Sequence, residues 1–180
     1  MYLDGKKVRL RKFRERDLTA IKKWLNDPEL QWFTEEDFPI RWTDEMMTQL
    51  YGKALKGKKE MYAIETLAGV LVGEIWLYPL SMEHRYGEMV ITIDRAYQGQ
   101  GYGRDAIQVI LRYGFIHLEL HRIEIKVYSF NERALYLYRS SGFSEEGLLR
   151  ERIQRNGEYY DQIIMSILRE EYLQRRERSG

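Results

Sequence analysis

The feature that most constrains the fold of this chain is a cluster of glycines between an apolar, strand-like run and a helical pattern. The stretch reads Ile91-Thr92-Ile93-Asp94-Arg95-Ala96-Tyr97-Gln98-Gly99-Gln100-Gly101-Tyr102-Gly103-Arg104. Glycines let the backbone approach a ligand closely, and the first backbone N–H groups of a helix have no partner within it. Because the helix dipole adds positive character there, this geometry favours a phosphate or pyrophosphate. We therefore predict an anion site, with a ligand-free tight turn as the alternative.

Two nucleotide-binding motifs come close to this spacing. Gly101-Tyr102-Gly103-Arg104-Asp105-Ala106 satisfies the G-x-G-x-x-G/A pattern of dinucleotide folds. That fold places the loop after the first strand of a parallel sheet and an acid at the end of the next strand, whereas Glu124 has the right offset but begins its strand. Gly103-Arg104-Asp105 also stands where a nucleotide-hydrolysing loop needs Gly-Lys-Ser/Thr. A dinucleotide-binding oxidoreductase is therefore a disfavoured alternative.

Composition narrows the class of protein. With 180 residues, 44% of them hydrophobic and 32% charged, the chain predicts one globular domain, with a core over residues 7–168 and a tail over 169–180. The absence of cysteine excludes disulfides and thiolate chemistry and predicts a cytoplasmic protein. Among the three histidines only His117 and His121 have a helical i, i+4 spacing, and the residues between them do not make an H-E-x-x-H zinc motif, so no metal is expected. The net charge of +1 and the absence of a long apolar run predict neither a nucleic-acid nor a membrane partner.

Hydrophobic periodicity and turn residues predict an α+β fold. The predicted strands are residues 8–13, 61–65, 69–77, 87–93, 123–128, 143–152 and 160–168. The predicted helices run from Asp17 to a stop at Asn26-Asp27-Pro28, from Thr43 to Gly57-Lys58-Lys59, from 103 to 118 and from Asn131 to Gly142. An Asn156-Gly157 turn joins the last two strands. The early strands are expected to pair antiparallel, and the strand–helix–strand unit across the glycine loop is expected to pair in parallel.

Two motifs carry a resemblance to a known family. Gln98-Gly99-Gln100-Gly101-Tyr102-Gly103 matches the pattern Q/R-x-x-G-x-G/A, and Asn131, Ala134, Leu137, Tyr138, Gly142 and Phe143 match N-x-x-A-x-x-L-Y-x-x-x-G-F. With both, the sequence resembles the GNAT superfamily of acetyl-coenzyme-A-dependent N-acetyltransferases over most of its length. Its last strand pair resembles the branch of ribosomal-protein N-terminal acetyltransferases and bacterial spermidine acetyltransferases. The resemblance implies a twisted, mostly antiparallel sheet flanked by helices, with one βαβ crossover that carries the pyrophosphate loop.

The resemblance also implies acetyl-CoA as cosubstrate, without a metal. The backbone of residues 91–93 would pair with the pantetheine arm, and the loop from Gln98 to Arg104 would hold the pyrophosphate. Asn131 would contact the cofactor arm, although its role as a helix cap explains it equally well. The implied cofactor-binding residues are Ile91, Thr92, Ile93, Gln98, Gly99, Gln100, Gly101, Tyr102, Gly103, Arg104 and Asn131.

Acetyl transfer to an amine needs a base for the ammonium and an acid for the departing thiolate. Tyr138 stands where the family keeps that acid, with a core tyrosine as the alternative. Glu88 opens the strand that leads into the glycine loop and is the first candidate for the base, with a solvated strand-end carboxylate as the alternative. Glu74 and His84 are weaker candidates.

The acceptor amine is indicated by a local excess of acids. Residues 27–45 contain seven acids and one base, Arg41, which suits a polyamine such as spermidine, although ordinary loop and helix-start acids would look the same. Glu35, Glu36 and Glu74 are the candidate acceptor-binding residues. A peptide N-terminus is a close competitor, and an aminoglycoside or amino-acid antibiotic is a further option. The rival to an enzyme is a noncatalytic module that binds coenzyme A as a sensor, and a homo-oligomer is compatible with either.

Overall fold

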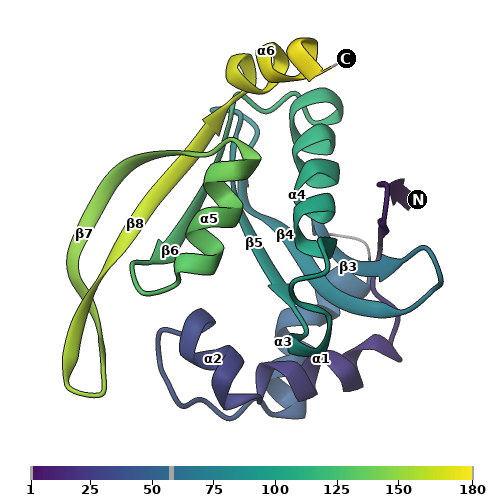
Figure 1. Ribbon diagram of the computed structural model, residues 1–180. Coiled ribbons are helices and arrows are strands. Elements are labelled where there is room, and N and C mark those ends of the chain that lie inside the picture. Colours follow the sequence, from purple (N-terminus) through teal and green to yellow (C-terminus); the bar gives the residue numbers. More distant parts are fainter. Residues whose placement is uncertain (1, 57–58, 180) are drawn as a thin grey trace. The chain divides into compact units, whose positions relative to one another are not determined.

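The computed structural model describes residues 2–56 and 59–179, in which eight strands hydrogen-bond in the order β1-β2-β3-β4-β5-β6-β8-β7 (Figure 1). The strands are β1 (Tyr2–Asp4), β2 (Val8–Arg11), β3 (Met61–Thr66), β4 (Leu71–Ser81), β5 (Tyr86–Ile93), β6 (Arg122–Tyr128), β7 (Ser144–Arg155) and β8 (Glu158–Leu168). The α-helices are α1 (Asp17–Leu25), α2 (Pro28–Thr34), α3 (Asp44–Leu55), α4 (Tyr102–Arg112), α5 (Glu132–Ser141) and α6 (Arg169–Ser179). A 3-10 turn, η1 (Arg95–Tyr97), precedes α4, and a π-helical turn, η2 (Tyr113–His117), follows it. The predicted mixed, mostly antiparallel fold is confirmed.

The one predicted crossover is confirmed as well. Strand β5 pairs with β6 in parallel, with Tyr86 opposite Arg122 and Glu88 opposite Glu124, and α4 lies between them in sequence. Antiparallel pairing joins β1 to β2, β2 to β3, β3 to β4, β6 to β8 and β7 to β8. The βαβ unit therefore carries the glycine loop between its first strand and its helix.

The chain divides into two compact units that share β4, β5 and α4. Unit 1 comprises Met1–Trp76 and Ile91–Val109, and unit 2 comprises Leu77–Val90 and Ile110–Gly180. Unit 1 therefore contains the first three strands, the first three helices and the whole glycine loop. Unit 2 contains the parallel pair, α5 and the β7–β8 hairpin.

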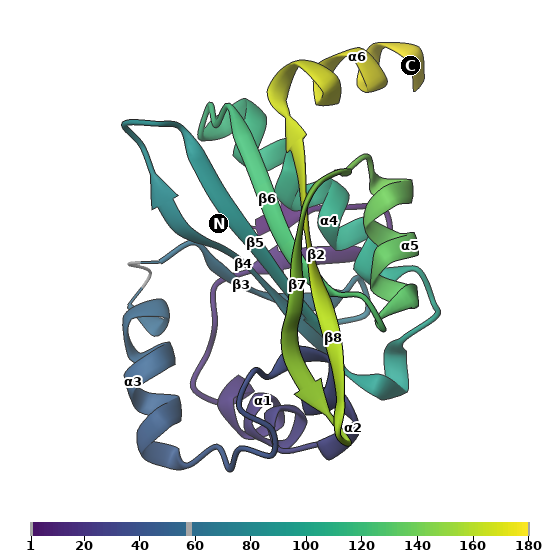
Figure 2. The same ribbon diagram turned by 90° about the vertical axis from the view of Figure 1, so that its left-hand side faces the viewer.

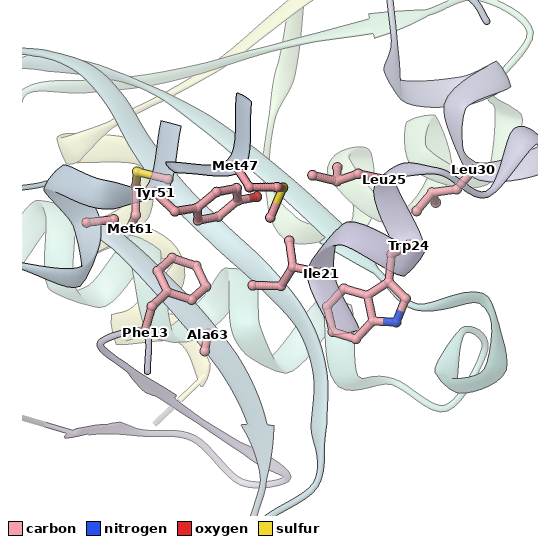
Figure 3. Packing of buried hydrophobic residues seen from close by; sticks show 10 residues of the cluster. Phe13, Ile21, Trp24, Leu25, Leu30, Met47, Tyr51, Met61 and Ala63 are labelled. Atoms are coloured by element: carbon pink, nitrogen blue, oxygen red, sulfur yellow. The ribbon is translucent and has the colours of Figure 1, made fainter. Parts of the chain in front are cut away.

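A hydrophobic cluster holds the helices of unit 1 on β3 (Figure 3). Ile21 of α1, Tyr51 of α3 and Met61 of β3 are almost fully buried in it. The Tyr51 ring packs edge-on against Phe13, with centroids 5.4 Å apart. The other members are Trp24, Leu25, Leu30, Met47, Ala54 and Ala63. Close packing of this kind fixes the orientation of α3 and of any polar group that Tyr51 carries.

The sequence prediction is wrong about α2. Asn26-Asp27-Pro28 was expected only to end α1, but a second helix begins at Pro28. The Asp27 side chain caps it by accepting from the backbone N–H of Glu29 at 3.0 Å, and proline fits the first helical position because no N–H is needed there. The same residues thus end one helix and begin the next. The predicted end of α3 at Gly57 and Lys58 lies outside the described residues, and the last helical residue is Leu55.

A buried ion network joins β2, α1 and β3 of unit 1. The Arg11 guanidinium donates to both oxygens of Asp17, at 2.7 and 3.0 Å, and to Glu65 Oε2 at 2.6 Å. All three side chains are less than one-tenth exposed. Because each charge has an oppositely charged partner in good geometry, the network is tolerated inside the protein.

In unit 2, β6, β8 and β7 lie side by side (Figure 2). The predicted Asn156-Gly157 turn is confirmed, since both residues have positive φ, 50° and 85°. The cap of α5 is confirmed too: Asn131 Oδ1 accepts from the Ala134 N–H at 3.1 Å, and Gly142 ends the helix at φ 112°. The tail is a helix, α6, in which Tyr172 is buried and stacks near Phe115.

Candidate active site

The glycine loop of unit 1 has the conformation of an anion cradle. Gly99 and Gly101 lie in the left-handed region at φ 79° and 86°, and α4 begins at the next residue, Tyr102. The first helical hydrogen bond runs from the Asp105 N–H to the Gly101 carbonyl at 3.1 Å, so the N–H groups of residues 102–104 precede the helical ladder. These donors, together with the charge of Arg104, match what a pyrophosphate requires. Coenzyme A therefore fits the residues present.

The Gln98 side chain braces this loop from within. Its amide donates to the Ile93 carbonyl at 2.9 Å, which links the end of β5 to the start of the loop. The Gln100 amide likewise donates to the Ala96 carbonyl at 3.2 Å. Both predicted cofactor-binding side chains thus make a hydrogen bond inside the loop, and two of their backbone groups are also bonded: the Gln98 N–H to the Arg95 carbonyl and the Gln100 carbonyl to Lys7 Nζ.

Gly73 allows β4 to approach the end of β5 closely. A Cβ atom at Gly73 would lie 2.3 Å from the Thr92 carbonyl oxygen and 3.2 Å from Ile93 Cα. The Asp94 N–H also donates to the Val72 carbonyl at 2.9 Å, so β4 and the end of β5 lie side by side here. Glu74, the residue after Gly73 on β4, thus lies near the strand segment that the family resemblance assigns to the pantetheine arm.

Glu74 is buried and bound to a tyrosine that sequence reasoning missed. The Tyr51 hydroxyl lies 2.9 and 2.8 Å from the two Glu74 carboxylate oxygens, and the two residues are 0% and 3% exposed. Burial raises the pKa of Glu74 to about 7; the Glu35 charge raises it too, while Tyr51 and Trp76 act in the opposite direction. Burial also raises the pKa of Tyr51, so its hydroxyl keeps the proton that it donates.

Of the three predicted acceptor-binding acids, Glu35 and Glu74 interact electrostatically. Burial raises the pKa of Glu35, and its charge acts on both Glu74 and Tyr51. The nearby indole N–H of Trp42 lowers the pKa of Glu35, and that of Trp76 lowers the pKa of Glu74. Neither indole nitrogen meets the geometry of a hydrogen bond with a described residue. Glu36, in contrast, is exposed. The charge of Glu35 therefore acts on Glu74, and the two residues form an acidic pair.

The two predicted catalytic residues belong to unit 2. Tyr138 of α5 is 8% exposed, and its ring packs edge-on against Phe143 with centroids 5.9 Å apart. Burial raises the pKa of its hydroxyl to about 12, so the group is protonated at neutral pH, as an acid must be. Glu88 accepts a hydrogen bond from Lys126 Nζ at 2.7 Å, and its side chain is 21% exposed. A base at Glu88 would have to act from within this ion pair.

Comparison with known proteins agrees with this geometry. A family model described as "Acetyltransferase (GNAT) domain" matches residues 7–144. The spermidine N(1)-acetyltransferase of Vibrio cholerae is 35% identical over 171 residues, which cover 93% of this chain and 96% of that protein. The Escherichia coli K12 enzyme of the same name is 32% identical and covers 92% and 88%. A crystal structure of the Vibrio cholerae enzyme with CoA and spermine superposes with a TM-score of 0.83 at 32% identity, covering 92% of this chain and 98% of that one.

A strand, a glycine loop and a helix in this order form a site whose donors suit a pyrophosphate such as that of coenzyme A. The matches above define the class further: the chain belongs to the GNAT acetyltransferase family, and it is an acetyl-CoA-dependent N-acetyltransferase. The catalytic class is thereby favoured over the sensor and the dinucleotide-binding alternatives. Among the described residues, no helix is long and apolar enough to cross a membrane, and no cluster of side chains suits a metal ion.

Proposed function

We propose that this acetyltransferase acetylates a primary amine of a polyamine such as spermidine or spermine. The similar proteins from Vibrio cholerae and Escherichia coli bear the name spermidine N(1)-acetyltransferase, and one of their structures holds spermine. The observation in this chain that carries the proposal is the acidic pair of buried Glu74 and half-buried Glu35. Two neighbouring acids attract a polyamine, which carries several ammonium groups, more strongly than they attract an amine with only one.

The coenzyme is assigned to the cradle of unit 1. The N–H groups of the loop from Gln98 to Arg104 bind the pyrophosphate, and the backbone of Ile91, Thr92 and Ile93 pairs with the pantetheine arm. Asn131 contributes as the cap of α5 and as a contact to the arm. When bound, acetyl-CoA supplies a thioester as the acyl donor.

The chain's own residues then move two protons. A carboxylate takes a proton from the acceptor ammonium, because only the neutral amine has a lone pair for attack on the acyl carbon. The Tyr138 hydroxyl gives its proton to the sulfur as the carbon–sulfur bond breaks, which avoids release of a free thiolate. No cysteine is present to accept the acetyl group, which excludes a cysteine-bound intermediate and supports direct attack of the amine on the thioester.

Two carboxylates compete for the role of base. Glu88 remains the first candidate and acts directly or through a water molecule, with Lys126 as its partner in the resting protein. Glu74 is the second, because a base with a pKa of about 7 is well matched to neutral pH. Comparing kcat of Glu88→Gln and Glu74→Gln at saturating acceptor separates them: the variant of the base loses kcat, whereas the variant of a binding residue raises KM.

Acceptor specificity is tested by release of free coenzyme A. Purified protein is given acetyl-CoA with spermidine, spermine, a peptide with a basic N-terminus or an aminoglycoside, after thermal stabilisation by acetyl-CoA has been measured. We expect stabilisation and rapid thiol release with the polyamines. We also expect Glu74→Gln to raise the polyamine KM about tenfold, roughly 1.4 kcal/mol, while Glu36→Gln, which removes an exposed acid, changes it little. Thiol release with the peptide but not with polyamines would overturn the proposal.

The protonation of Glu74 should be visible in stability. A carboxyl whose pKa is about 7 in the folded state and 4.5 otherwise binds its proton more tightly when folded. Its contribution to the free energy of unfolding therefore falls by about 3 kcal/mol as pH rises from about 4.5 to 7, and levels off above that. Urea denaturation of the wild-type protein and of Glu74→Gln across this range measures the difference, with Glu36→Gln as the control. Parallel pH profiles of wild type and Glu74→Gln would show that Glu74 titrates normally.

A further inference from the structure

We propose that the N-terminal turn, Gly5–Val8, holds the coenzyme loop in its binding conformation through Asp105, which makes Asp105 a positioning residue for coenzyme binding. This inference rests on the proposed placement of the pyrophosphate at the loop from Gln98 to Arg104. It concerns residues of unit 1 alone, and neither Asp105 nor any residue of the N-terminal turn belongs to the two motifs that carry the family resemblance.

The first observation is the number of donors on one carboxylate. Asp105 lies in the first turn of α4, and its side chain accepts from the backbone N–H groups of Lys6 at 3.1 Å, Lys7 at 2.7 Å and Val8 at 2.9 Å. These partners are 97 to 99 residues away in sequence. Hydrogen bonds to a charged group are the stronger kind, so three of them on one side chain fix the start of α4 firmly.

The second observation is that the turn is shaped around this carboxylate. The Gly5 N–H donates to the Val8 carbonyl at 2.8 Å and closes the connection between β1 and β2. A Cβ atom at Gly5 would lie 2.4 Å from Asp105 Oδ2 and 2.8 Å from Val109 Cγ2. A side chain at this position therefore displaces the Asp105 carboxylate and the Val109 side chain, or else the turn itself.

The third observation extends the contact into the loop itself. Lys7 Nζ donates to the Gln100 carbonyl at 2.9 Å, and the end of the Lys7 side chain lies 3.1 to 3.8 Å from the position of a Cβ atom at Gly101. The Lys7 carbonyl in turn accepts from the Leu67 N–H at 3.2 Å, which anchors the turn to the β3–β4 connection. The glycine loop is thus tied to the antiparallel strands at a point remote from the reacting atoms.

The same hydrogen bonds keep the Asp105 carboxylate from competing with a bound phosphate for the start of α4. An acid in the first turn of a helix normally interacts with the positive end of that helix, where it would compete with a bound phosphate. The Asp105 carboxylate instead takes three donors from the N-terminal turn. The donors of α4 are left for the coenzyme, and the loop is ordered before the coenzyme arrives, which lowers the entropic cost of binding.

The test measures coenzyme affinity and catalysis separately. In Asp105→Asn one carboxylate oxygen becomes an NH₂ group that faces backbone donors, and Gly5→Ala introduces the close contact with Asp105. For both variants we expect the acetyl-CoA Kd from calorimetry to rise about tenfold, with kcat at saturating coenzyme within about twofold of wild type. Amide hydrogens of residues 99–104 should also exchange faster in the free protein.

Matched variants separate loop positioning from general destabilisation. Asp17→Asn alters a different carboxylate of unit 1, one that is buried, and a Cβ atom at Gly52 would meet nothing within 4 Å. Asp17→Asn and Gly52→Ala should leave the Kd and the loop exchange unchanged. A folded Asp105→Asn protein with the wild-type Kd would overturn the inference, whatever its melting temperature. Gly101→Val tests the placement of the pyrophosphate at the glycine loop. If this variant leaves the Kd unchanged, the proposed coenzyme placement fails. If it abolishes binding while Asp105→Asn does not, only the positioning role of Asp105 fails.

Discussion

Replacing Tyr138 by phenylalanine should lower kcat by about 10²- to 10⁴-fold, the usual contribution of a general acid. The variant keeps the ring that packs against Phe143, so the fold should survive. It loses the hydroxyl whose pKa burial raises to about 12 and which is therefore protonated at neutral pH. Steady-state kinetics with acetyl-CoA and spermidine measures kcat, and calorimetry should give a coenzyme Kd close to that of wild type.

The same helix offers a matched control for this experiment. Tyr136 lies two residues away on α5 and is 69% exposed, so Tyr136→Phe removes a hydroxyl without touching the core. We expect it to retain full activity. Equal activity of the Tyr138→Phe and wild-type proteins would mean that Tyr138 serves packing only and that the thiolate leaves unprotonated or takes its proton from water.

The largest loss of stability is expected from Arg11→Met. Removing the guanidinium leaves the carboxylates of Asp17 and Glu65 buried without their partner, and breaking a buried ion pair from one side typically costs about 3–5 kcal/mol. Chemical denaturation at neutral pH measures this loss. Arg9→Met, which removes a more exposed arginine from the same strand, should cost less than about 1 kcal/mol.

The pH dependence of the free energy of unfolding should have opposite sign in the wild-type protein and in Arg11→Met. Burial alone would raise the pKa of Asp17, but hydrogen bonds from the Arg11 side chain and the Arg14 backbone bring it below its ordinary value of 3.8. In the wild-type protein this contribution is present above pH of about 4 and is lost as pH falls below that. In Arg11→Met the largest hydrogen-bond donor to Asp17 is gone while its burial remains, so protonation of Asp17 should partly restore stability as pH falls toward 4. A stability loss that is the same at every pH would show that the cost comes from packing instead.

Elements defined by neighbouring residues were predictable from the sequence. Asn131 and Thr43 cap their helices as expected, and Asn156-Gly157 forms the expected hairpin turn, because such residues act on backbone groups within four positions. The error at Pro28 has the same origin: proline ends a helix and also begins one, and the local pattern does not decide between them. The loop from Gln98 to Arg104 could be identified because its spacing is itself the signal.

The sequence by itself therefore determined the element order apart from β1 and α2, the parallel crossover, the glycine loop between a strand and a helix and, through two motifs, the family. Only the tertiary structure decided which distant side chains meet: Tyr51 with Glu74, 23 residues apart, Arg11 with Glu65, 54 apart, and Asp105 with a turn almost 100 residues earlier. In the sequence Tyr51 is one apolar position of a helix, and Asp105 is one acid in a first turn. Their roles depend on strand register and helix packing, which bring together groups that no local pattern relates.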